Sequence, residues 1–220
     1  MFAVILLCGF ATTMFTACGG DDEIVKPKDS EEEQKPDQQT KKAEYYDVTF
    51  TVVGQKSLLK VITADLTINY LKNGQQNKTV VELDEEFEGE SALDALETSW
   101  FNKATEVAFT SEPKLAQEMN QKYIYRTTIK DIAVDTKYSY EFFCHVNKNF
   151  QIAEGDSLIY MVPTMMITET AKGTSNREVV EKFYYKGGVV RPSGLARFME
   201  QYDERVPMFL KGEYTAGERK

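Results

Sequence analysis

The sequence is poor in the side chains on which most enzyme chemistry depends. Its 220 residues contain one histidine, three cysteines and one tryptophan. The histidine, His145, directly follows Cys144 in a segment where polar and apolar residues alternate, as they do in a β-strand. Neighbouring side chains of a strand point to opposite faces, so these two cannot act together as base and nucleophile. A zinc site would also lack ligands. We therefore expect a protein that is not an enzyme and that needs no cofactor.

The chain also lacks an excess of positive charge. It carries 26 Lys and Arg against 35 Asp and Glu, a formal net charge of −9, and no basic stripe. Because proteins bind nucleic acid by neutralising phosphates with Lys and Arg, we expect no nucleic-acid partner. Nine of the acids and five lysines lie in residues 19–44, together with two prolines. This composition is typical of a flexible, solvated linker.

No apolar run is long enough to span a bilayer. The longest, residues 2–10, is interrupted only by Gly9, and its length suits the core of a signal peptide. The sequence Phe15-Thr16-Ala17-Cys18 that follows resembles a bacterial lipobox, although Phe15 replaces the usual Leu-like residue. The resemblance implies removal of residues 1–17 and acylation of Cys18, which makes the lipid bilayer a partner of the chain. No Lys or Arg precedes the apolar run, so a start codon upstream of Met1 is an open alternative.

The residues after Cys18, Gly-Gly-Asp-Asp-Glu, resemble the acidic export signal of surface lipoproteins from Bacteroidetes. This resemblance implies a lipid-anchored protein of the outer membrane, exposed on the cell surface, on a linker that spans residues 18–44. A location facing the periplasm is the alternative. With Cys8 in the signal peptide and Cys18 as the anchor, Cys144 is the last cysteine, and the mature chain forms no internal disulfide.

From Tyr45 onward the pattern is mainly that of β-strands. Residues 46–52 and 65–71 alternate between polar and apolar, and Asn73-Gly74 predicts a hairpin turn that leads into a strand over 79–83. Ser91 and Asp94 resemble a capping box, which predicts a short helix over about 92–101. Strands are expected over 105–110 and 122–132, and another over 157–168.

The best local signature is the spacing of Ile132, Val134, Thr136 and Tyr138. It resembles the corner between strands E and F of fibronectin type III and other immunoglobulin-like domains, where a tyrosine opens the second strand. The resemblance implies a mainly β fold, an immunoglobulin or fibronectin III-like β-sandwich over residues 45–170, with a short helical insertion. Residues 171–220 are expected to be an extension that packs on the sandwich, with strands near 178–185 and 208–214 and a helix capped by Ser193.

Exposed aromatic rings are the best candidates for ligand binding, because sugar-binding sandwiches stack such rings on pyranose faces. We name Trp100, Phe143 and Tyr184, although packing in the core is the expected role of Trp100, which shares a helical face with Leu93 and Leu96.

Asp84, Glu86 and Glu88 are a weaker candidate, for calcium. With Gly89 they are similar to the start of an EF-hand loop, but Ala95 stands where the bidentate Glu is required, so we favour a solvated acidic turn.

Three functions fit the sequence. The first is a non-catalytic, membrane-anchored binding module of the cell envelope, which captures glycans or mediates adhesion. The second is a structural, assembly or immunity-type protein of the outer membrane that binds another envelope protein. The third, with least support, is a hydrolase that uses carboxylates. A flat aromatic platform favours the first, an exposed apolar groove the second, and two carboxylates across a cleft the third.

Overall fold

The computed structural model describes residues 42–219, except 85, 91, 112, 148–149, 152–159, 175–177, 192 and 195–207. The predicted signal peptide, Cys18 and most of the linker therefore lie outside the described residues. Both hydrophobic clusters lie in the unit formed by residues 40–220.

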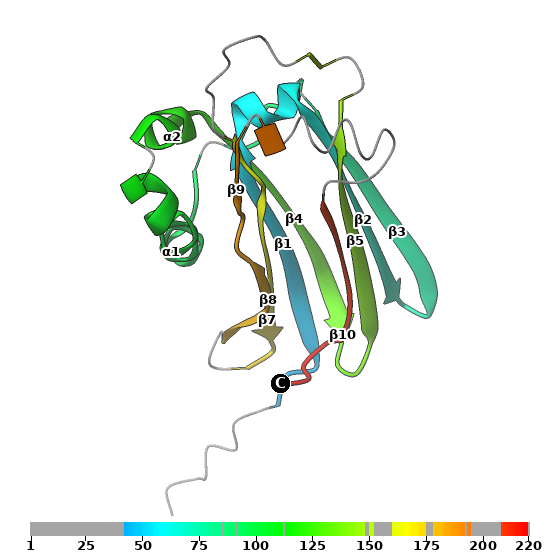
Figure 1. The fold of residues 1–220 in the computed structure, drawn as a ribbon. Coiled ribbons are helices and arrows are strands. Elements are labelled where there is room, and N and C mark those ends of the chain that lie inside the picture. The colour runs from blue at the N-terminus through cyan, green and yellow to red at the C-terminus, as the bar shows by residue number, and fades with distance from the viewer. Residues whose placement is uncertain are drawn as a thin grey trace, which may run out of the picture. The chain divides into compact units, whose positions relative to one another are not determined.

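Two four-stranded antiparallel sheets form the body of this unit (Figure 1). Sheet A has the order β4-β1-β7-β8, and its strands are β1 (Tyr45–Gln55), β4 (Lys122–Ala133), β7 (Thr164–Lys172) and β8 (Val179–Tyr185). Sheet B has the order β10-β5-β2-β3, and its strands are β2 (Ile62–Lys72), β3 (Gln75–Leu83), β5 (Lys137–Val146) and β10 (Met208–Thr215). The chain is thus mainly β, as the sequence predicts.

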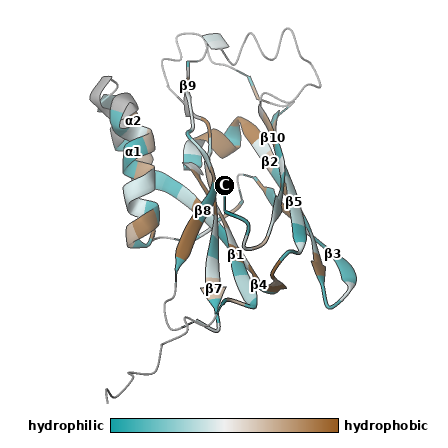
Figure 2. Cartoon of the chain, turned by 90° about the horizontal axis from the view of Figure 1, so that it is seen from below, coloured by the Kyte–Doolittle hydropathy of each residue, from teal (hydrophilic) through white to brown (hydrophobic). Residues whose placement is uncertain are grey.

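The remaining elements are short or helical. They are β6 (Tyr160–Met161), β9 (Val189–Val190), the 3₁₀ turns η1 (Lys56–Lys60) and η2 (Met119–Gln121), and the helices α1 (Ala95–Ser111) and α2 (Pro113–Glu118). The helices cover the outer face of sheet A, and no described element lies over the outer face of sheet B (Figures 1 and 2).

The core between the sheets follows from the alternation along the strands. Each strand directs every second side chain inward, and the inward side chains of β1, β2 and β5 are almost completely buried. These residues are Val48, Phe50, Val52, Ala64, Leu66, Ile68, Tyr138, Tyr140, Phe142 and Cys144. The alternation of Cys144 and His145 is confirmed, since Cys144 is fully buried and His145 faces outward.

The predicted hairpin between β2 and β3 is also confirmed. Asn73 (φ 52°) and Gly74 (φ 74°) form its two-residue loop, and Lys72 pairs with Gln75. Positive φ at both loop positions is the geometry of a type I′ turn, whose twist suits a right-handed pair of strands. The returning strand is longer than predicted and begins at Gln75.

The helical insertion differs from its prediction. The strand expected over residues 105–110 is wrong, because α1 continues to Ser111. Burial of Trp100, Phe101, Ala104 and Thr105 on one face of the helix outweighs the β-branched residues of this segment. The Thr105 hydroxyl donates to the carbonyl of Phe101, a bond that accommodates threonine in a helix.

The expected boundary near residue 170 is also not a structural one. Residue 170 lies inside β7, and the segment beyond it supplies β8 and β10, which are edge strands of the two sheets. This segment is therefore part of the sandwich rather than an extension packed on it. The helix predicted after Ser193 lies outside the described residues from position 195.

Candidate functional site

An aromatic strip on the outer face of sheet B is the best candidate site. The rings of Phe143 on β5 and Phe209 on β10 are opposite each other in the strand register, and their centroids are 4.1 Å apart at an interplanar angle of 18°. The His145 ring lies 6.0 Å from Phe143 at 16°. These three nearly parallel rings form what we call the ring ladder.

Charged groups lie at both ends of the ring ladder. Asp65 on β2 places its Oδ2 atom 3.2 Å from Nε2 of His145. At the other end, Nζ of Lys211 lies 5.6 Å from the centroid of Phe209. Like the three rings, Asp65 and Lys211 occupy outward-facing positions of their strands, because these positions alternate with the buried ones. The strip therefore combines apolar ring surface with hydrogen-bonding groups of both charges.

The stacking decides which ring surface a ligand can reach. Phe209 covers one face of Phe143, so Phe143 offers mainly its edge, whereas Phe209 is 43% exposed. A flat ligand can lie across the free face of Phe209 once Lys211 moves aside, and long lysine side chains move readily at a surface. Phe209 is thus the more accessible ring, and sequence reasoning did not single it out. Alternation within β10 could have marked it as outward-facing, but only the sheet brings it to Phe143.

The other two candidate aromatics pack against each other, with Trp100 buried and Tyr184 partly buried. Trp100 is 5% exposed and its ring lies 5.1 Å from that of Tyr184, edge to face. They belong to a second hydrophobic cluster, between α1, α2 and the outer face of sheet A, with Val53, Phe101, Leu115, Met119, Ile124 and Met166. The expectation of an exposed ring is therefore wrong for Trp100, where the alternative of core packing holds, while Tyr184 is partly buried against it.

The acidic run after β3 forms a turn in which Asp84 accepts two hydrogen bonds from backbone amides. Asp84 accepts a hydrogen bond from the amide of Glu86 at 3.0 Å on its carboxylate, and another from the amide of Phe87 at 3.1 Å on its carbonyl. In the described part of the chain, no three His, Cys, Asp or Glu side chains, these acids included, are grouped as ligands of a metal ion.

Gly89 has a structural reason to be glycine. Its φ is +66°, and an added Cβ would lie 2.6 Å from the carbonyl oxygen of Ile124. The glycine lets the loop approach β4 closely enough for Glu90 to donate its amide to the same oxygen at 2.7 Å. The similarity of this glycine to the sixth position of a calcium loop thus has another explanation.

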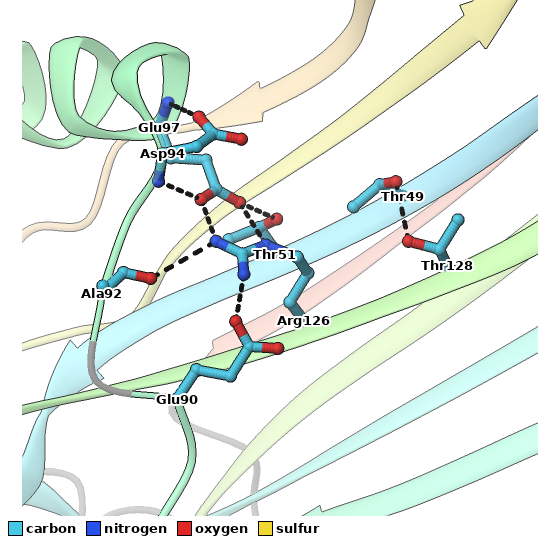
Figure 3. Close-up of polar contacts among 8 residues, drawn as sticks. All are labelled: Thr49, Thr51, Glu90, Ala92, Asp94, Glu97, Arg126 and Thr128. Atoms are coloured by element: carbon cyan, nitrogen blue, oxygen red, sulfur yellow. Dashed lines mark hydrogen bonds and ion pairs between the residues drawn. The ribbon is translucent and has the colours of Figure 1, made fainter.

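A buried carboxylate anchors the helical insertion to sheet A (Figure 3). Glu97 accepts hydrogen bonds from the Thr51 hydroxyl at 2.7 Å, from Nε of Arg126 at 2.9 Å and, in a close ion pair, from another nitrogen of Arg126. Arg126 also pairs with Glu90. Burial alone raises the pKa of Glu97, but these bonds and the charge of Arg126 outweigh it, so the pKa lies below its ordinary value of 4.5.

The same glutamate caps the helix. The amide of Glu97 donates to Oδ1 of Asp94 at 2.9 Å, and the amide of Asp94 donates back to Oε2 of Glu97 at 3.0 Å. This reciprocal pair is a capping box, three residues later than the one predicted at Ser91 and Asp94.

A second buried carboxylate, Glu169 on β7, joins sheet A to the start of β5 and to the segment that follows β10. It accepts hydrogen bonds from the Tyr138 hydroxyl at 2.9 Å and from the amide of Gly217 at 3.0 Å, and it pairs with Lys182 at 3.3 Å. Lys182 also donates to carbonyl oxygens of residues 215 and 218. Burial and the neighbouring carboxylate raise the pKa of Tyr138, so this hydroxyl stays protonated and donates.

Comparison with known protein families, with curated proteins and with solved structures finds no match for this chain. Among the described residues, no helix is long and apolar enough to cross a membrane. A proposal about its function therefore has to rest on the surfaces and buried groups described above.

Proposed function

We propose that this chain is a non-catalytic binding module of the cell envelope, tethered through an acylated Cys18, and that it captures glycans on the outer face of sheet B. The observation that carries the proposal is the ring ladder. Phe209 is an exposed aromatic ring flanked by Lys211, and Asp65 and His145 stand at the other end of the ladder. Aromatic rings with hydrogen-bonding groups beside them suit the apolar face and the hydroxyls of a sugar.

The charged groups fit the polar part of such a ligand. The ammonium group of Lys211 donates to hydroxyl oxygens, while the carboxylate of Asp65 accepts from hydroxyl hydrogens. The two buried carboxylates are already satisfied by protein donors, since Glu97 and Glu169 each accept several hydrogen bonds. Binding without hydrolysis agrees better with these contacts than carboxylate catalysis does.

We further propose that the sandwich is immunoglobulin-like. In this assignment β1 and β4 pair as strands B and E, and β2, β5 and β10 pair as C, F and G, with β7 beside β1 in the place of strand A. Tyr138 then stands at the start of strand F, as in a tyrosine corner, but its hydroxyl donates to Glu169 instead of the backbone. A crystal structure in which β1 does not lie between β4 and β7 would contradict the assignment.

Glycan capture is tested with residues 40–220, which contain both hydrophobic clusters. We expect saturable binding to at least one member of a panel of plant, mucosal and bacterial glycans, measured on an array and then by calorimetry. Phe209→Ala is expected to weaken that binding by about tenfold or more, the usual effect of losing one aromatic hot spot. Phe143→Ala should act in the same direction, because it removes the support of Phe209.

The matched control is Val179→Ala, which trims an exposed apolar side chain on sheet A, 46% exposed. It should leave both binding and the melting temperature unchanged. Trp100→Ala is unsuitable as a binding test, because it removes a buried ring and measures stability. No binding at millimolar glycan, or binding that survives Phe209→Ala unchanged, would refute the proposal.

A further inference from the structure

The free edge of sheet B is formed by β3, which pairs with β2 on one side and ends the strand order on the other (Figure 1). It is nine residues long, and its outward side chains are exposed, with Val80 at 58%. A long exposed edge strand presents unpaired N–H and C=O groups that can pair with another strand. Natural proteins usually block such edges, so the side chains of β3 decide whether this one is blocked or used.

The hairpin fixes which backbone groups point to the free edge. Lys72 and Gln75 flank a two-residue turn and therefore form a hydrogen-bonded pair, after which bonded and non-bonded pairs alternate. Odd-numbered residues of β3 thus bond to β2, and even-numbered residues direct their N–H and C=O groups outward. After Gln75, which is next to the turn, the even-numbered residues are also the ones with exposed side chains, namely Gln76, Lys78, Val80 and Glu82.

These side chains are self-complementary. Lys78 and Glu82 lie two residues before and two residues after Val80. If two copies of β3 pair antiparallel with Val80 opposite Val80, each Lys78 lies opposite the Glu82 of the other copy, and the pairing is hydrogen-bonded at all three positions. Opposite charges directly across a pair of strands stabilise it, and like charges weaken it.

Other registers lack this agreement. A shift that centres the pair on residue 78 places Lys78 opposite Lys78, and one centred on residue 82 places Glu82 opposite Glu82. The intermediate shifts place Val80 opposite a charged residue. Glu82 also has Asp65 opposite it on β2, so a lysine on the other side relieves a contact between like charges. A lone lysine would block an edge, whereas one charge of each sign, placed symmetrically about a valine, selects a single two-fold pairing.

We propose that this chain forms a homodimer through β3, in which two copies of sheet B join edge to edge about a two-fold axis at Val80. Such an isologous contact closes on itself and does not propagate into fibres. The ring ladders of the two copies then lie on one continuous sheet. The proposal is independent of glycan binding, because none of the side chains that define the register belongs to the ring ladder.

Charge exchange tests the proposal. Sedimentation velocity of residues 40–220 over a range of concentrations is expected to show a monomer–dimer equilibrium. Lys78→Glu and Glu82→Lys each place like charges opposite each other twice, and each should raise the dimer dissociation constant by about 10- to 100-fold. The double variant K78E/E82K exchanges the two charges and should restore dimerisation.

A mixture supplies the most specific result. Combining the K78E chain with the E82K chain pairs two glutamates with two lysines, so heterodimers should form although neither variant dimerises alone. Lys56→Glu, which makes the same charge change at an exposed position in η1, is the control and should dimerise like the unaltered chain. Unchanged melting temperatures show that the variants fold. A monomer at millimolar concentration, or a double variant and mixture that remain monomeric, would overturn the proposal.

Discussion

The strongest test of the structure concerns Glu97, which joins the helical insertion to sheet A. Glu97→Gln keeps the size of the side chain but removes its charge. Arg126 is then left in a partly buried position, 24% exposed, and among the described residues only the half-exposed Glu90 remains as its ion-pair partner. Removing one member of a buried ion pair costs about 3–5 kcal/mol, and the exposure of Arg126 reduces this to about 2 kcal/mol. Glu97→Ala also removes the acceptor of the Asp94 amide, which is one half of the capping box, and this adds about 1 kcal/mol.

The assay is urea unfolding of residues 40–220 at neutral pH, with Glu90→Gln as the matched control. Glu90 has a side-chain exposure of 47% and contacts the same arginine, so its loss should cost less than about 1 kcal/mol. In the double variant with Arg126→Met, the cost of Glu97→Gln should shrink, because no unpaired charge remains. Equal losses for Glu97→Gln and Glu90→Gln would refute the reasoning.

The pH dependence gives an independent check of the same site. The pKa of Glu97 is lower in the folded chain than its ordinary value of 4.5, so the folded state holds this carboxylate ionised. Its contribution to stability is present above pH 4.5 and is lost as the pH falls through the folded pKa. The unaltered chain should therefore lose stability relative to Glu97→Gln as the pH falls below about 4.5. A constant difference between the two proteins across that range would contradict the lowered pKa.

Five further substitutions, at four positions, test the interior and the turn. Trp100→Ala should cost about 3–5 kcal/mol in urea unfolding, whereas Trp100→Phe should cost clearly less, because it keeps most of the ring and removes a buried indole N–H that has no partner among the described residues. Lys182→Met should cost about 3–5 kcal/mol by leaving Glu169 buried with its charge unpaired, and Tyr138→Phe only about 1–2 kcal/mol, since it removes one hydrogen bond; similar losses for the two would contradict the ion pair. Gly74→Ala should lower the melting temperature by a few degrees, a loss of about 1 kcal/mol, because alanine is strained at φ +74° although no atom lies within 4 Å of its Cβ; an unchanged melting temperature would contradict the turn geometry.

The strands were the predictable part of this fold. Alternation over residues 46–52 and 65–71 predicts β1 and β2, and Asn73-Gly74 predicts the hairpin, because both signals are local. The outward position of His145 beside a buried Cys144 follows from the same period of two. The continuation of the helix beyond residue 104 was missed, because helices in proteins are stabilised mainly by tertiary packing, here the burial of Trp100, Phe101 and Ala104, rather than by the propensity of their residues.

The candidate site was predictable only in part. Phe143 was recognised as an outward-facing ring, but its partner Phe209 lies 66 positions later and on a strand that only the sheet brings alongside. Trp100 and Tyr184 illustrate the converse. Both are aromatic and far apart in sequence, and whether such rings face solvent or each other depends on where α1 lies over sheet A.

The sequence by itself determined a mainly β chain with an acidic, cysteine-poor composition, and for the alternating strands β1, β2 and β5 it determined which side faces the core. These properties depend on the spacing of residues over a few positions. Only the tertiary structure decided that residues 208–215 lie beside β5, that Glu97 and Glu169 are buried among donors, and that β3 is a free edge. These depend on pairing between segments far apart in the chain, which no local spacing specifies.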